Sequence, residues 1–207
     1  MSRKLLGLFC LATLLSLAGC SLPGARPQAI SHYVLEVPAV AGIAVPTNTV
    51  RPVLLLREAE AGGFSQSLRL VYSRAPGTQA QYQYARWNEA PPKRLFALLR
   101  QRLLASGLYA GVVPLGSGVQ GDYQLNFRVL DFLHNAVQTP GSAYVKLEVE
   151  LVQRSAARLI AQQVFVADVP IPEPTAAAAA KGLGQASGQA LDATIAWLAR
   201  VQPADAR

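Results

Sequence analysis

Apolar and polar residues alternate most regularly in the second half of this chain. In residues 123–129 and 143–151 every second residue is apolar, and polar or charged residues fill most positions between them. A period of two places one face of a strand in the core and the other in water, as antiparallel sheets allow. The phase changes at Leu130, which predicts a β-bulge near Val129 and Leu130.

Shorter apolar runs bounded by proline, glycine and small residues predict five further strands. They lie at residues 32–37, 53–56, 68–73, 81–84 and 159–166. The segment Ala75–Thr78 contains a proline and a glycine that suit a turn, so residues 68–84 are predicted to form a hairpin.

Two amphipathic helices complete the pattern. Pro91 and Pro92 are typical of a first helical turn, leucines at a spacing of four follow them, and Gly107 ends the helix. The second helix is predicted at residues 175–201, with small residues first and large ones last on its buried face. The order of strands, helix, strands and helix predicts a single α+β domain, with an antiparallel sheet and two main helices packed on one face.

Finer expectations concern the polar and small residues of these helices. Arg94, Arg100 and Arg102 are expected to face solvent. Gly184 and Gly188 have the GxxxG spacing of membrane helix pairs, but the polar residues around them exclude a bilayer. We expect the two glycines to pack closely on the sheet.

The N-terminus has the pattern of a secretory signal. Arg3 and Lys4 precede an apolar run at residues 5–17, and Ala18 and Gly19 stand before Cys20. The run is shorter than the roughly 20 residues that cross a bilayer core. The segment resembles bacterial lipoprotein signals, which implies that residues 1–19 are removed and that Cys20 is lipidated.

This anchor predicts the location and the boundaries of the protein. Two or three acyl chains hold a protein at a membrane almost irreversibly. Ser21 is not the Asp that resembles an inner-membrane retention signal in enteric bacteria, so we expect an outer-membrane location with the domain facing the periplasm. Residues 20–31 are the predicted lipidated Cys and tether, 32–201 the folded domain and 202–207 a C-terminal tail.

The charge and the cysteines restrict the partners. The precursor carries 19 Lys and Arg against 12 Asp and Glu, a net charge of +7. The basic residues are scattered and the protein is secreted, which argues against nucleic acid and favours anionic lipid or an acidic protein. Cys10 lies in the signal and Cys20 is used by the lipid, so neither a disulfide nor a thiolate metal site is expected.

No motif predicts catalysis, and we expect no enzyme activity, cofactor or metal. Gly116–Gly121 matches GxGxxG, but a strand follows it instead of the helix that a dinucleotide site needs, so we predict a loop. His32 and His134 are the only histidines, and neither has the spacing of a triad or a metal site.

A short block rich in aromatic and charged residues precedes the first helix. Tyr84, Arg86, Trp87 and Glu89 stand in the run YARWNEAPP. This block resembles the Y-x-R-W-x-E-x-P stretch of the ABC-type transport auxiliary lipoproteins, and residues 33–35 and 121–125 are similar to further segments of that family. The family includes the lipoprotein of the paraquat-inducible system. The resemblance implies a noncatalytic partner of a Mce-domain protein and an ABC permease and ATPase complex that moves lipids between the inner and outer membranes.

Two interpretations of the block stay open. In the structural one, Trp87 anchors the core between hairpin and helix, and Arg86 and Glu89 form a local ion pair. In the functional one, the four residues bind a partner or lipid.

An apolar contact surface is also expected, since exposed apolar patches commonly mark binding sites. Its candidates are Val40, Ile43 and Val45 and, separately, the segment 130–137. Phospholipid binding and a homo-oligomer are left open. Two other functions also remain: an accessory of lipopolysaccharide export or cell-wall synthesis, and a periplasmic enzyme with an unrecognised site.

Overall fold

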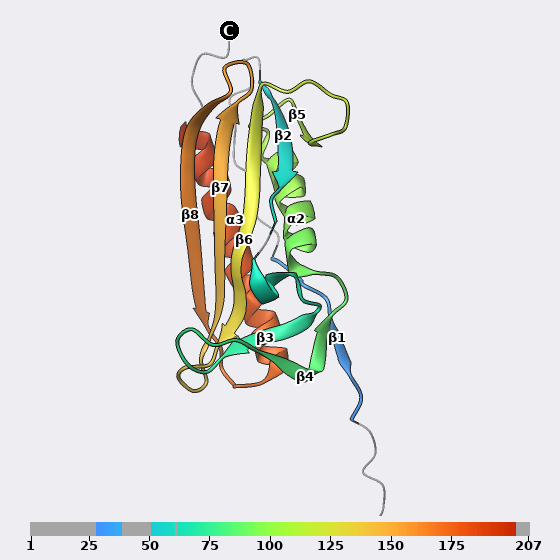
Figure 1. Ribbon diagram of the computed structural model, residues 1–207, viewed down its shortest axis with the longest axis vertical. Coiled ribbons are helices and arrows are strands. Elements are labelled where there is room, and N and C mark those ends of the chain that lie inside the picture. Colours follow the sequence, from blue (N-terminus) through green and yellow to red (C-terminus); the bar gives the residue numbers. More distant parts are fainter. Residues whose placement is uncertain (1–27, 39–50, 61, 202–207) are drawn as a thin grey trace, which may run out of the picture.

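The computed structural model describes residues 28–38, 51–60 and 62–201. Figure 1 shows a long twisted sheet with the helices α2 (Pro91–Ser106) and α3 (Ala176–Val201) on one face. The predicted α+β class, the two helices and the single domain are confirmed. The signal peptide, Cys20, the C-terminal tail and the candidates Val40, Ile43 and Val45 lie outside the described residues.

Eight strands form the sheet in the described part of the chain. They are β1 (Ser31–Tyr33), β2 (Val53–Glu58), β3 (Arg69–Ser73), β4 (Ala80–Trp87), β5 (Gly111–Pro114), β6 (Tyr123–Asn135), β7 (Ser142–Gln153) and β8 (Arg158–Pro170). The predicted antiparallel meander is confirmed in β6–β7–β8, and the hairpin in β3–β4. The strand predicted at residues 32–37 ends at Tyr33, and β5 lies in an apolar run for which no strand was predicted.

The sheet is mixed, so the prediction of an antiparallel sheet was wrong in this respect. β2 runs parallel to β5 and β6, β3 parallel to β6, and β1 parallel to β4. Parallel neighbours require the chain to return to the same end before it pairs again. The short 3₁₀ helix η2 (Gly63–Gln66) lies in the connection between β2 and β3, and α2 lies in the connection that leads to β5. The alternation of apolar and polar residues alone does not predict these connections between parallel strands.

The predicted β-bulge is present in β6. Its register against β7 shifts between Val129 and Asp131, which leaves Leu130 as the extra residue. The Leu130 carbonyl accepts a hydrogen bond of 3.3 Å from the Ser65 hydroxyl of η2. The bulge separates the part of β6 that pairs with β2 from the part that pairs with β3.

The two helices cover different parts of the sheet. α2 packs against β2, β5 and β6, and it ends at Gly107 with a φ of 68°, in the left-handed region that glycine tolerates. α3 packs against β7 and β8. Within the described residues, no helix is both long enough and apolar enough to span a bilayer.

The glycines of α3 do not all face the sheet, so the expectation for Gly184 and Gly188 was wrong. A Cβ at Gly184 would lie 2.1 Å from the Glu36 carbonyl oxygen, and Gly188 lies beside Val37 and Pro38. Because these two glycines have no side chain, residues 36–38 of the N-terminal segment pack close to the helix. Gly182 is the glycine that packs on the sheet, at Ala143 of β7.

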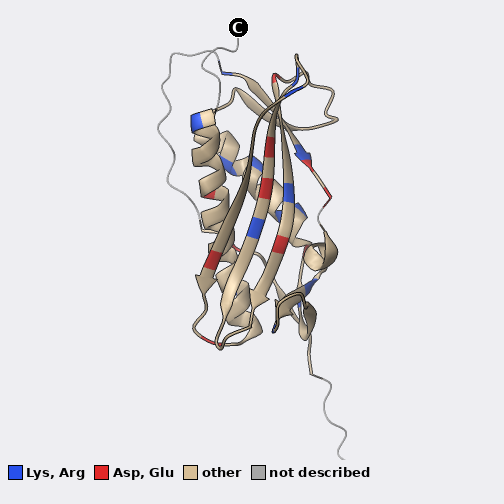
Figure 2. Cartoon of the chain, turned by 60° about the vertical axis from the view of Figure 1, so that its left-hand side comes forward, with Lys and Arg blue, Asp and Glu red and all other residues tan. Residues whose placement is uncertain are grey.

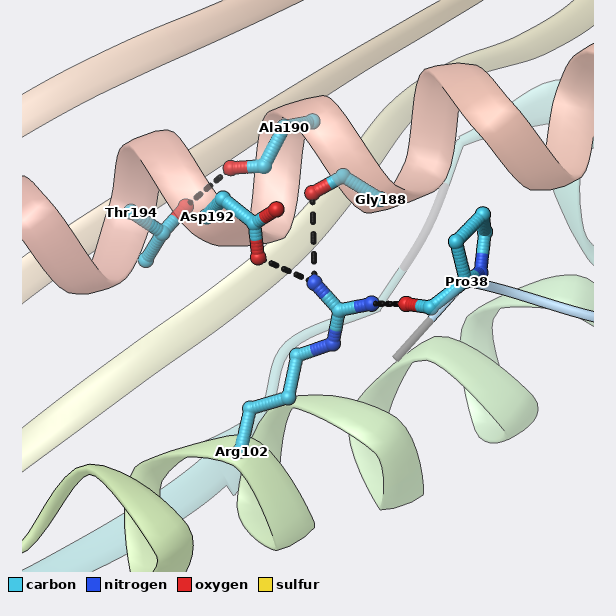
Figure 3. A network of polar contacts seen from close by, with 6 residues as sticks. All are labelled: Pro38, Arg102, Gly188, Ala190, Asp192 and Thr194. Carbon is cyan, nitrogen blue, oxygen red and sulfur yellow. Dashed lines mark hydrogen bonds and ion pairs between the residues drawn. The ribbon is translucent and has the colours of Figure 1, made fainter. Parts of the chain in front are cut away.

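Three arginines of α2 bind backbone carbonyls, so the prediction that they face solvent was wrong. Figure 3 shows Arg102 reaching from α2 to the Gly188 carbonyl and Asp192 of α3 and to the Pro38 carbonyl. Arg94 donates to the Leu35 carbonyl and Arg100 to the Val112 carbonyl. A helix pattern shows which face is polar, but it does not show which carbonyls of other elements that face meets.

Candidate docking surface at the hairpin end of the sheet

The two ends of the sheet differ in what they carry. The hairpin end is the end with the β3–β4 turn and the β6–β7 turn, and the far end has the β7–β8 turn (Figure 1). The sheet face that the helices do not cover is called the outer face.

The outer face of β6 and β7 is polar over the far half and the middle of these strands, whereas β8 exposes Val164 and Val166 beside them. Arg128 of β6 pairs with Glu148 of β7 at 3.0 Å, and Asn126 donates to Glu150 at 3.0 Å. Figure 2 shows charges of both signs along these strands. Gln162 of β8 also donates to Glu148, at 3.0 Å, so several polar side chains here have cross-strand partners, which is the ordinary arrangement of a solvated sheet face.

The outer face gains apolar and aromatic residues toward the hairpin end. Leu133 of β6 stands opposite Tyr144 of β7, and both line a hollow of about 660 Å³ beside the β3–β4 turn. Phe64 and Val137 also line it, and they are 43% and 50% exposed. The described lining also includes one charged residue, Asp131, and the polar residues Ser73, Thr78, Gln79 and Asn135. Apolar side chains in solvent around a hollow are typical of a docking surface.

A buried histidine holds the backbone beside this hollow. His134 Nδ1 lies 2.7 Å from the Tyr82 hydroxyl, and Nε2 lies 3.1 Å from the Pro140 carbonyl oxygen. A carbonyl only accepts, so Nε2 carries the proton and Nδ1 accepts from Tyr82. Burial lowers the pKa of His134, the bond to Pro140 opposes this, and the charge of Arg74 lowers the pKa further.

The groups around His134 stabilise the fold. Burial raises the pKa of the Tyr82 hydroxyl, which therefore stays a donor. Gly141 closes the β6–β7 turn with a φ of 91°, and a Cβ there would lie 2.3 Å from the Asn135 carbonyl oxygen. In the described part of the chain, no group of three His, Cys, Asp or Glu side chains could hold a metal ion.

The tryptophan of the YARWNEAPP block lies in the core. Trp87 is buried, with its ring 6.4 Å from that of Tyr33 and 5.7 Å from that of Phe132, both edge-on. These contacts join β1, β4 and β6 at the hairpin end. Tyr84 is partly exposed on β4.

The predicted ion pair between Arg86 and Glu89 is absent. Glu89 contacts Lys93 instead, at 3.3 Å along the first turn of α2. Arg86 is inside β4, where the pleat directs its side chain to the sheet face opposite the buried Trp87. Closeness in sequence therefore did not bring the two charges together.

Comparison with known proteins decides the family. The model of the ABC-type transport auxiliary lipoprotein component matches residues 33–196. The chain belongs to this family. As a member, it is a membrane-anchored lipoprotein associated with ABC-type transport.

The fold of this auxiliary lipoprotein recurs in solved structures. It is similar to a Xanthomonas campestris protein at 23% identity and a TM-score of 0.69, over 81% of this chain and 94% of that one. It is also similar to an uncharacterized protein at 17% identity and a TM-score of 0.63, over 83% and 99%. At these identities the likeness shows the fold alone. No curated protein matches the chain.

Part of the candidate docking surface of this auxiliary lipoprotein was predicted from the sequence. Leu133 and Val137 belong to the segment 130–137, which was a candidate, whereas Phe64 and Tyr144 were missed. Tyr144 occupies a polar-face position of a regular strand, between the buried Ala143 and Val145, and Phe64 lies in a glycine-rich connection. Neither has a periodic signal, because the register of β6 and β7 and the placement of η2 bring them to the hollow.

Proposed function

We propose that this auxiliary lipoprotein is a noncatalytic accessory of an ABC transport system that includes a Mce-domain protein and moves lipids between the inner and outer membranes. It is anchored through Cys20 in the outer membrane and faces the periplasm. The family match over residues 33–196 supports the transport role, since it covers nearly the whole folded domain.

The observation that carries the docking role is the apolar hollow on the outer face. Phe64 and Val137 expose about half of their surface beside Leu133 and Tyr144, at the point where the ion pairs of the outer face stop. Apolar and aromatic anchors that fill or line a pocket supply most of the free energy of protein association. A partner segment with an apolar side chain at its centre fits this surface.

The place of the hollow relative to the anchor supports the same role. The first described residues leave the domain at the hairpin end (Figure 1). Residues 20–27 span at most about 29 Å when fully extended. The docking surface therefore works within a short distance of the membrane that holds Cys20.

Copurification from native membranes tests the docking role. Phe64→Ser and Val137→Ser should each lower recovery of the Mce-domain protein about tenfold, because each removes an apolar anchor and places a hydroxyl in the contact. Leu159→Ser is the matched control, since Leu159 is 53% exposed on β8 at the far end. Equal recovery with all three variants contradicts the role of the hollow.

The same experiment separates the alternative functions. Recovery of lipopolysaccharide-export or cell-wall proteins in place of a Mce-domain protein would reassign the partner. Hydrolysis of an ester or glycan by the purified wild-type protein would contradict a noncatalytic role.

Cys20→Ala tests the anchor. The variant should incorporate no labelled palmitate and should leave the membrane fraction, because the acyl chains supply the retention. Circular dichroism should remain that of the wild type. Label in the variant would contradict lipidation at Cys20.

A further inference from the structure

Two arginines stand directly opposite each other on neighbouring strands. Arg69 of β3 is the register partner of Arg86 of β4. The Trp87 amide donates to the Leu68 carbonyl at 2.6 Å, a bond that flanks the pair and identifies it as the non-hydrogen-bonded kind. In such pairs the two side chains lie closest together. The guanidinium groups therefore start from adjacent positions on one face.

A third basic residue extends this arrangement. His32 of β1 is the partner of Arg86 on the other side of β4. Cross-strand partners share a face, so Arg69, Arg86 and His32 form a basic row across β3, β4 and β1. Leu70 and Trp87, which neighbour the row along the chain, are buried on the opposite face.

The charges of Arg69 and Arg86 in the basic row are not neutralised within the described residues. The three ion pairs there involve Lys93, Arg102 and Arg128, and no described carboxylate lies within 4 Å of Arg69 or Arg86. The Nε of Arg86 is buried and has no hydrogen-bond partner. Like charges directly opposite each other destabilise a sheet, and a buried donor without an acceptor costs free energy.

An anion with several oxygens removes both costs. Guanidinium groups form paired hydrogen bonds with phosphate, and a phosphate between two arginines turns their repulsion into two attractions. The Nε–H of Arg86 belongs to the same planar fork, so it gains its missing acceptor when the side chain turns toward the anion.

The neighbours of His32 identify the source of the phosphate. Ile30 and Val34 stand two residues before and after His32 and are 44% and 54% exposed. Along an extended segment, such residues share a face. Exposed apolar side chains beside cations are typical of surfaces that bind the interface of an anionic membrane. A free phosphate ion does not require the apolar residues.

We infer that the basic row binds the phosphate of an anionic phospholipid in the membrane to which the domain is tethered. Ile30 and Val34 enter the interface beside the headgroup, and Arg69 and Arg86 hold the phosphate. The contact orients β1 and the hairpin end toward the bilayer. It is separate from the apolar hollow and does not depend on the transport partner.

Hydrogen exchange on the mature lipidated chain tests this inference. The protein is placed in nanodiscs of phosphatidylcholine alone or with about one third phosphatidylglycerol, so the anchor is the same in both. Exchange of the amides at residues 28–36 should slow about fivefold or more in the anionic discs, and the difference should shrink as salt rises. Equal exchange in the two kinds of disc overturns the inference.

Variants and a soluble anion identify the residues and the source. Arg69→Gln and Arg86→Gln should each remove most of the slowing, and Arg69→Gln serves alone if Arg86→Gln alters exchange in β7. Arg158→Gln is the matched control, because it removes an exposed arginine of β8 at the far end. Loss of the slowing in this control, or the same slowing by inorganic phosphate in phosphatidylcholine discs, overturns the inference. Val137→Ser should keep the slowing, which separates this site from the docking surface.

Discussion

The two halves of β6 are both extended strand, but they differ in their neighbouring strands and in the side chains that they carry. From Tyr123 to Val129 the strand lies between β2 and β7, and its outer face is occupied by paired polar side chains. From Asp131 to Asn135 it lies between β3 and β7, and it carries the buried His134 and the lining of the apolar hollow. The bulge at Leu130 is the border between them.

The difference shows which half is free to serve a partner. A strand half whose polar residues already pair across the sheet offers a partner little apolar surface. The other half keeps its backbone in place by buried polar contacts on the core side, and this leaves its outer side available for Leu133 and its neighbours. The regular half is the scaffold, and the irregular half presents the surface.

The largest effect is expected at the core of the hairpin end. Trp87→Ala should lower the free energy of unfolding by about 3–5 kcal/mol, because it removes a buried ring packed on Phe132 and Tyr33. Urea denaturation measures the change. Tyr84→Ala, in the same block but partly exposed, is the control and should cost clearly less. An unchanged urea midpoint for Trp87→Ala contradicts the core role and favours a partner contact.

The turn that closes the irregular half is the next most sensitive position. Gly141→Ala should destabilise the protein by about 1–3 kcal/mol, because alanine at a φ of 91° is strained and its Cβ would overlap the Asn135 carbonyl. Thermal melting checks this. Gly77→Ala in the β3–β4 turn is the control, since its φ is also positive but its Cβ position is open. If both variants lower the melting temperature equally, the close approach of residue 141 to the Asn135 carbonyl has no measurable effect on stability.

Acid should weaken the irregular half through His134. Its pKa in the folded protein lies below the ordinary value of 6.5, so the unfolded chain takes up the proton first as the pH falls. The contribution of His134 is therefore complete above about pH 6.5 and is lost as the pH falls through the folded pKa. Denaturation at pH 7.5 and 5.5 should show a smaller loss for His134→Gln than for the wild type. Equal losses would mean that other groups cause the pH dependence.

The smallest effect is expected on the regular half. Arg128→Ala should change the free energy of unfolding by less than about 1 kcal/mol, because the Arg128 side chain is 46% exposed and water screens its charge. Urea midpoints of Arg128→Ala and the double variant with Glu148→Ala measure the pair. A cost comparable to that of Gly141→Ala would remove the contrast between the two halves.

Regular periodicity predicted the regular half, and the rest of the fold depends on distant contacts. The strands β6 and β7, the bulge and both helices follow from local patterns, because burial on one face repeats with the geometry of each element. The parallel pairing of β2 and of β3 with β6 depends on the return paths of the chain. The burial of Arg102 depends on carbonyls of α3 and Pro38. The basic row depends on register, which places residues 32, 69 and 86 side by side.

The packing of the N-terminal segment against α3 also determines how the domain resists a mechanical force applied through the anchor. β1 runs parallel to β4, so tension along the tether shears their hydrogen bonds together and does not unzip them singly. Behind β1, the chain at Glu36 lies against Gly184 and the chain at Pro38 is held by Arg102. A load that ruptures β1 next meets α2 and α3, so the mechanical strength of the anchored domain resides at its helix junction.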